Sequence, residues 1–173
     1  MNQGTQQKKP NPQIQKDLWS ADDKLVLKTL HKLRTDGNLT YVPDLLNLLG
    51  QTRNELIEKE LIRLLADIKE RGVIPFVVAG LKKPGLKDAR AGILSAIWQS
   101  GLDYSGHIHL FIQLFLEGDY LVALESFTVI EQSIAHLSDQ QVAEERKNLL
   151  DGLDSLSEVK KPLARELVNL MQA

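Results

Sequence analysis

A pattern of apolar residues and proline recurs along this chain after 32 residues. Val42-Pro43 opens one copy, and Ile74-Pro75 opens the next at the same offset. The apolar positions that match are Leu45 with Val77, Leu46 with Val78, Leu49 with Leu81, Ile57 with Ala89, Leu61 with Ile93, and Leu65 with Ile97. Their spacing of three and four residues is that of an amphipathic α-helix. The repeated unit is therefore predicted to be a pair of helices.

A third copy fits best 34 residues after the second, although it has no proline. Its first segment matches well, since Ile108, Phe111, Ile112 and Phe115 take the positions of Ile74, Val77, Val78 and Leu81. Its second segment agrees only in part, because Phe127 takes the position of Ile93 but Glu131 meets that of Ile97. The third copy extends the predicted repeat to about residue 132.

Helical spacing also covers the segments around residues 20–36, 139–154 and 160–172, with Asp36-Gly37-Asn38 expected to stop the first of these helices. One helix pair cannot cover its own apolar face, so neighbouring pairs must stack to form a continuous core. We therefore predict an all-α fold, an α-α superhelix of stacked antiparallel helix pairs with about eight to nine helices. No segment alternates with period two over a useful length, so strand content should be near zero.

In the unit from about residue 73 to 100, the first helix opens with an apolar residue and proline, Ile74-Pro75, and the second opens with Asp88-Ala89-Arg90. With these two features the unit resembles the HEAT repeat. The resemblance covers roughly residues 40 to 132 and implies an armadillo-like solenoid that acts through binding. It also implies that Asp88 and Arg90 tie adjacent repeats together by hydrogen bonds. In the first copy Glu58 occupies the position of Arg90, so that copy departs from the pattern.

Composition separates a short N-terminal segment from the rest. Residues 1–17 are rich in Gln, Asn, Lys and Pro, with Ile14 as the only large apolar residue after Met1. Such a segment cannot bury enough surface to offset its ordering entropy. We interpret residues 1–17 as a flexible tail, or as a strap that orders against a partner. Residues 18–173 are interpreted as a single HEAT-like domain.

Several classes of location and chemistry are disfavoured by composition. The chain has no cysteine, which excludes disulfides and thiol nucleophiles and fits a reducing compartment. We expect no secretory signal, and the longest apolar run, residues 108–116, is too short to span a membrane. The expected location is cytoplasmic, with no membrane attachment. Phosphate-binding glycine motifs and HExxH are absent, so we expect no cofactor and no metal.

Charge is distributed very unevenly. Residues 91–145 contain no Lys or Arg but eight acids, namely Asp103, Glu117, Asp119, Glu125, Glu131, Asp139, Glu144 and Glu145. Residues 1–90 hold 16 basic and 11 acidic residues. This pattern predicts an acidic surface that attracts a basic peptide or protein and repels nucleic acid. An ordinary solvated face would produce the same pattern.

Five residues are candidates for partner binding. Arg90, Glu125 and Ser126 belong to the second helices of the pairs, which we expect to form the binding face. Trp98 and Asp103 lie in the stretch from residue 98 to 104, which fits either a ligand pocket or a structural corner where Trp98 joins the core and Asp103 caps the next helix. His107 and His109 are two residues apart on a predicted helix, so they cannot easily bind one metal together.

Three functions remain open. The first is a non-catalytic scaffold that binds a protein or basic peptide. The second is an enzyme similar to the HEAT-like alkylpurine DNA glycosylases, whose aromatic and acidic residues would correspond in kind to Trp98 and Asp103. That function needs a basic groove, because Lys and Arg neutralise phosphates, and residues 91–145 supply none. The third is a fragment that works only within a larger assembly.

Overall fold

The computed structural model describes residues 9–36 and 39–172, and these ranges contain helices and turns but no β-strand. The prediction of an all-α fold is confirmed. The described residues form ten α-helices, rather than eight to nine: α1 Pro12–Leu18, α2 Asp23–Asp36, α3 Val42–Gln51, α4 Glu55–Asp67, α5 Ile74–Lys82, α6 Arg90–Ser100, α7 Ile108–Glu117, α8 Tyr120–Ile134, α9 Asp139–Gly152 and α10 Lys161–Leu170.

The chain divides into two compact units, Met1–Ser100 and Gly101–Ala173. We call them the N-terminal unit, which contains α1 to α6, and the C-terminal unit, which contains α7 to α10. The single domain over residues 18–173 that the sequence indicated stays a prediction.

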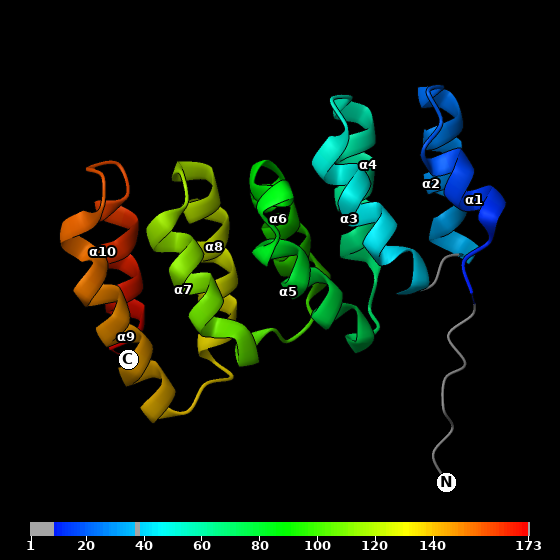
Figure 1. Ribbon diagram of the computed structural model, residues 1–173. Helices are drawn as coiled ribbons and strands as arrows, with labels where there is room; N and C mark the ends of the chain where they lie inside the picture. Colours follow the sequence, from blue (N-terminus) through cyan, green and yellow to red (C-terminus); the bar gives the residue numbers. More distant parts are fainter. Residues whose placement is uncertain (1–8, 37–38, 173) are drawn as a thin grey trace, which may run out of the picture. The chain divides into compact units, whose positions relative to one another are not determined.

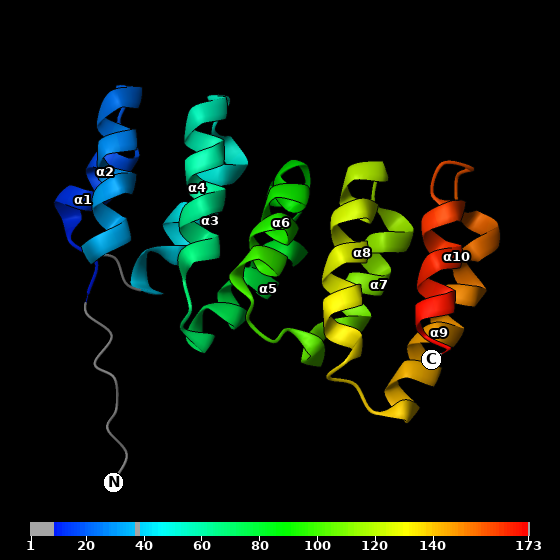
Figure 2. The ribbon, with the colours of Figure 1, turned by 180° about the vertical axis from the view of Figure 1, so that it is seen from behind.

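The N-terminal unit consists of helix pairs stacked side by side. The helices α2, α4 and α6 pack one against the next in one row, and α1, α3 and α5 do so in a second row (Figures 1 and 2). Leu61 on α4 and Ile93 on α6 are completely buried where the first row packs together. These are the apolar positions that the repeat predicted, so stacking buries the stripe that one pair alone would expose.

The helix starts recur at the positions that the sequence repeat predicted. Helix α3 begins at Val42 and α5 at Ile74, each with proline in its first turn. Proline is tolerated there because that N–H has no intrahelical partner. Helix α7 of the C-terminal unit begins at Ile108. A short 3-10 turn precedes each of the three: Leu39–Tyr41, Arg71–Val73 and Ser105–His107.

Helix α1 lies largely within residues 1–17, which the sequence indicated as a flexible tail or a strap. Asn11 caps it by accepting a hydrogen bond from the backbone N–H of Gln13 at 2.9 Å, and Leu18 at its end is completely buried. The backbone N–H of Asn11 donates to the Tyr41 hydroxyl at 2.9 Å, which ties this segment to the start of α3. Order therefore begins before residue 18, because one buried leucine and two specific contacts hold the segment. Residues 1–8 and the helix stop predicted at Gly37-Asn38 lie outside the described residues.

The C-terminal unit has four helices around an apolar core. Helix α7 packs against α8 and α9, and α10 packs against α8 and α9 in turn. Phe111 and Phe115 of α7 are completely buried, and the ring of Tyr104 meets Phe111 edge-on with centroids 6.4 Å apart. The side chain of Asp119 caps α8 by accepting from the Val122 N–H at 2.9 Å. Ser138 and Gln141 form a capping box at the start of α9.

Candidate functional site

The charge asymmetry of the sequence coincides with the boundary between the two units. The N-terminal unit contains 16 basic and 11 acidic residues, and the C-terminal unit contains 5 basic and 12 acidic residues. Their formal net charges are therefore +5 and −7. All eight acids of the stretch 91–145 belong to the C-terminal unit. The acidic surface that the sequence predicts is thus a property of one unit rather than of the whole chain.

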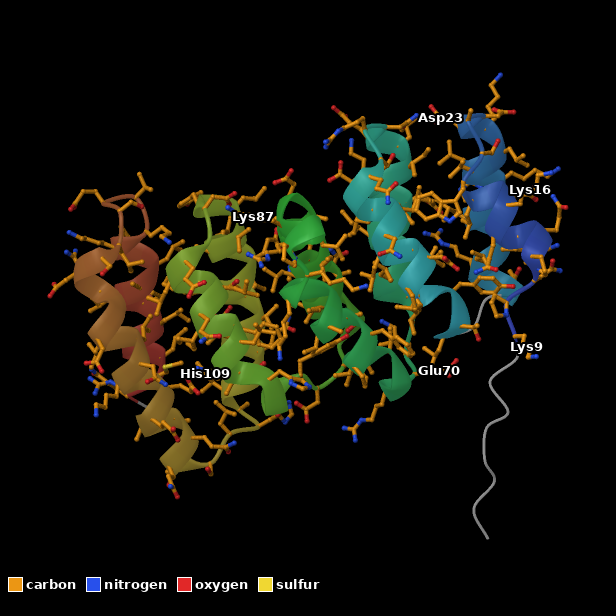
Figure 3. All side chains as sticks on the ribbon, in the orientation of Figure 1. Lys9, Lys16, Asp23, Glu70, Lys87 and His109 are labelled. Carbon is orange, nitrogen blue, oxygen red and sulfur yellow. The ribbon has the colours of Figure 1, made fainter. Side chains whose placement is uncertain are left out.

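Most of these eight acids face solvent, but one does not. Asp103, Glu117, Asp119, Glu131, Asp139 and Glu144 are exposed, and Glu125 is partly exposed. Glu145 is only 6% exposed, and its carboxylate lies 3.2 Å from Nδ1 of His109. Glu145 also accepts a hydrogen bond from the Asn148 amide at 3.0 Å. Figure 3 shows His109 on α7. Glu145 therefore joins α9 to α7 inside the unit and does not belong to the acidic surface.

Two of the five basic residues of the C-terminal unit are engaged in contacts within the unit. Lys160 is 6% exposed, and its ammonium donates to the backbone carbonyls of Phe115, Leu116 and Gly118 at 3.1, 2.7 and 2.9 Å. Burial lowers the pKa of Lys160, while the Asp119 carboxylate acts in the opposite direction. Lys161 binds Glu158, and this hydrogen bond lowers the pKa of the Glu158 carboxyl. Lys160 and Lys161 are thus engaged within the unit.

An apolar patch lies on α8 among the exposed acids. Tyr120, Leu121 and Leu124 are 48%, 54% and 36% exposed, and we call them the α8 patch. The sequence indicated Leu121 and Leu124 as apolar positions of a helix without showing that they face outward. The core side of α8 is instead formed by Val122, Ala123, Ser126, Val129, Ile130 and Ser133. The small residues on this side of α8, Ala123, Ser126 and Ser133, allow close packing against neighbouring helices. They were the sequence signal that could have indicated that the opposite side, with Leu121 and Leu124, faces outward.

The structure buries one predicted partner-binding residue and shows a backbone contact of another. Ser126 is completely buried, so it cannot contact a partner on the surface of α8. Arg90 is partly exposed, and its Nε–H donates to the backbone carbonyl of Leu81 at 3.0 Å. Leu81 belongs to α5, the other helix of the same pair. This bond joins the two helices of one pair, whereas the HEAT resemblance implies contacts between adjacent pairs.

The remaining predicted residues lie in different units. Trp98 is partly exposed in α6 of the N-terminal unit. Asp103 is exposed in the C-terminal unit, where its carboxylate accepts from the Ser105 N–H at 2.9 Å. This bond shapes the turn that leads into the 3-10 segment before α7. The N-cap positions of that segment and of α7 are held by Tyr104 and His107, so Asp103 does not cap the next helix as the structural interpretation expected. Glu125 lies on α8, next to the α8 patch.

The N-terminal unit contains a separate pocket of about 290 Å³. Leu45 and Tyr41 lie on its apolar part, and Arg34 and Asp67 on its polar part. Two of the charged residues that line it belong to one ion-pair network: Arg34 lies 3.4 Å from Asp67 and 3.2 Å from the buried carboxylate of Glu60, which His31 also approaches to 3.3 Å. This network holds α2 against α4, so a structural role accounts for it.

In the ranges 9–36 and 39–172, no three His, Asp or Glu side chains gather closely enough to hold a metal ion. Among the described helices, none has both the length and the apolar character of a membrane span.

The chain matches no known protein family, no curated protein and no solved structure. Function is therefore inferred from the charge and geometry of the chain itself.

Proposed function

We propose that this chain is a non-catalytic binding scaffold, and that its C-terminal unit binds a protein or peptide through a basic segment. The observation that carries the proposal is the net charge of −7 on that unit, with six of its acids exposed between Asp103 and Glu144. Exposed charges of one sign raise the local concentration of an oppositely charged partner and accelerate its association. The same field disfavours nucleic acid, whose binding requires Lys and Arg at the phosphates.

The helical architecture supports a role in binding rather than catalysis. Stacked helix pairs expose whole rows of helices as extended surfaces, which partners can follow over several repeats. The 32-residue recurrence of helix starts at Val42 and Ile74 supports a HEAT-like origin for these pairs. The absence of cysteine from the sequence supports a cytoplasmic location.

The proposal is tested by removing charge from one unit at a time. Glu117→Gln, Glu131→Gln and Glu144→Gln together remove three exposed acids from the C-terminal unit. Glu58→Gln, Glu70→Gln and Asp88→Asn remove three from the N-terminal unit as a matched control. The probe is a fluorescent lysine-rich peptide, and its Kd is measured by anisotropy at several salt concentrations. The first triple variant should weaken binding roughly three- to thirtyfold, since each exposed charge pair contributes little. The control should bind like the parent chain.

Three results would overturn the proposal. The first is no binding of the basic peptide even at low salt, where screening is weakest. The second is equal loss of affinity in both triple variants, because the charge of the C-terminal unit would then have no special role. The third is tight, salt-sensitive binding of duplex DNA, which would favour the DNA-processing alternative.

A further inference from the structure

The α8 patch is an exposed apolar surface held in place by a rigid helix start. Asp119 caps α8 through the Val122 N–H, and Val122 is only 5% exposed. With Val122 facing the core, helix geometry turns Leu121 and Leu124 to the opposite side. The exposure of Leu121 and Leu124 therefore follows from the Asp119 cap and the burial of Val122, and it does not require the end of α8 to fray. Two leucines and a tyrosine within five residues form an apolar anchor that a partner can cover.

Acidic side chains border this patch along the chain. Glu117 and Asp119 precede it, and Glu131 lies seven residues after Leu124, on the same side of α8. No Lys or Arg occurs anywhere in α7 or α8. The surface thus combines an apolar centre with acids at its edge, the arrangement of a protein interface whose core is apolar and whose rim is charged.

We propose that the α8 patch docks an amphipathic helix of a partner protein, with apolar side chains on one face and Lys or Arg at its edges. This inference rests on the proposed function and names the kind of basic segment that the C-terminal unit accepts. The partner's apolar face covers Leu121, Leu124 and Tyr120, while its cations lie near Glu117, Asp119 and Glu131. Helix-to-helix docking uses anchors three or four residues apart, which is the spacing of Leu121 and Leu124.

The negative charge of the C-terminal unit favours a basic helix over two other occupants, a second copy of the chain and a membrane surface. A second copy placed symmetrically on the patch would bring two C-terminal units of net charge −7 together, and like charges oppose such contact. A membrane surface with anionic lipids would be repelled by the same acids, because lipid-binding helices carry Lys and Arg on their polar face. A basic helix satisfies both the apolar centre and the acidic edge.

The test separates the apolar anchor from the charge. Leu121→Ser with Leu124→Ser removes the anchor and leaves every acid in place. Leu150→Ser is the matched control, since Leu150 is 39% exposed on α9 of the same unit. One probe is a lysine–leucine peptide of about five helical turns with all leucines on one face. The other has the same composition with its leucines spread around the helix. Circular dichroism checks that each variant keeps its helix content.

The parent chain should bind the one-faced peptide more tightly than the spread peptide. The double variant should lose about tenfold or more in affinity for the one-faced peptide, because anchor residues dominate interface energetics. Its salt dependence should stay unchanged, and Leu150→Ser should bind like the parent chain. The spread peptide should bind the double variant and the parent chain equally, since only charge attracts it.

Other outcomes would overturn the inference in distinguishable ways. If the double variant binds the one-faced peptide as well as the parent chain does, the α8 patch is not the docking site. If that binding is still salt-sensitive, the proposed function stands while this inference fails. If neither basic peptide binds, both proposals fail. If sedimentation shows self-association that the double variant abolishes, the occupant is a second copy. If vesicles of phosphatidylserine and phosphatidylcholine bind only the parent chain, the occupant is a membrane.

Discussion

Lys160 and Leu116 stand 44 positions apart in the chain, yet Nζ of Lys160 lies 2.7 Å from the backbone carbonyl oxygen of Leu116. The same ammonium reaches the carbonyls of Phe115 and Gly118. The last carbonyls of a helix have no partner within the helix, so a cation at the end of α7 satisfies them and complements the helix dipole. Lys69 plays a similar part in the N-terminal unit, where it donates to the carbonyls of Ala66 and Ser100.

We predict that Lys160→Met destabilises the chain by about 2–4 kcal/mol, because it leaves three backbone carbonyl groups at the partly buried end of α7 without their charged donor. Lys161→Met, which removes a cation bound to the exposed Glu158, should cost less than about 1 kcal/mol. Urea unfolding of both variants, followed by circular dichroism, measures the difference. Equal destabilisation by the two substitutions would show that the Lys160 contacts contribute nothing special.

Tyr104 should make stability depend on pH in the alkaline range. Burial raises the pKa of its hydroxyl from 10.0 to about 12. Between these two values the unfolded tyrosine loses its proton before the folded one, so unfolding releases a proton and the unfolding free energy falls as pH rises. The loss should reach about 2–3 kcal/mol by pH 12.

The measurement compares the parent chain with Tyr104→Phe, because lysines also titrate at this pH. The difference in unfolding free energy between the two chains should be constant below pH 9 to 10 and should shift in favour of Tyr104→Phe above it. A difference that stays flat up to pH 12 would contradict the prediction.

The contact between His109 and Glu145 should contribute to stability. His109→Ala removes one of the polar partners of a carboxylate that is 6% exposed, which should cost about 1–3 kcal/mol. His107→Ala is the control, since that side chain does not cap α7 and should change stability by less than about 0.5 kcal/mol. Thermal unfolding of the two variants at pH 7 provides the comparison. The prediction fails if His107→Ala proves the more damaging change.

Gly118 should not tolerate a side chain. A Cβ at this position would lie 2.5 Å from Cγ1 of Val122 and 2.6 Å from the carbonyl oxygen of Leu114. Because the second atom belongs to the backbone of α7, the turn between α7 and α8 would have to shift. Gly118→Ala should destabilise by about 1–3 kcal/mol. A Cβ at Gly106 would meet no atom within 4 Å. Gly106→Ala should therefore leave the unfolding free energy unchanged or raise it by about 0.4–1 kcal/mol. Chemical unfolding of both variants decides between these expectations.

Part of the fold could be predicted because its causes are local. The starts of α3, α5 and α7 follow from apolar spacing and from the positions of Pro43 and Pro75, which act within one turn of the chain. Helix α1 was missed because it is short and has few apolar residues. Its order depends on the burial of Leu18 and on the hydrogen bond between Asn11 and Tyr41, which lie 30 positions apart.

The candidate site was harder to predict, because exposure depends on neighbours. The apolar spacing of α8 does not distinguish Leu121, which is 54% exposed, from Val122, which is 5% exposed. Ser126 was predicted to meet a partner but is completely buried. A helix with apolar residues on several sides can turn any of them inward, and the packing of adjacent helices selects one.

The sequence by itself determined the helical periodicity, the positions where the repeated helices begin, and the separation of basic from acidic residues along the chain. These properties depend on residues within a few positions of one another or on composition alone. Only the tertiary structure decided that Glu145 is held inside by His109, that Lys160 reaches the end of α7, and that Leu121 and Leu124 remain uncovered. The physical reason is that burial and pairing join residues far apart in sequence, and folding alone brings them together.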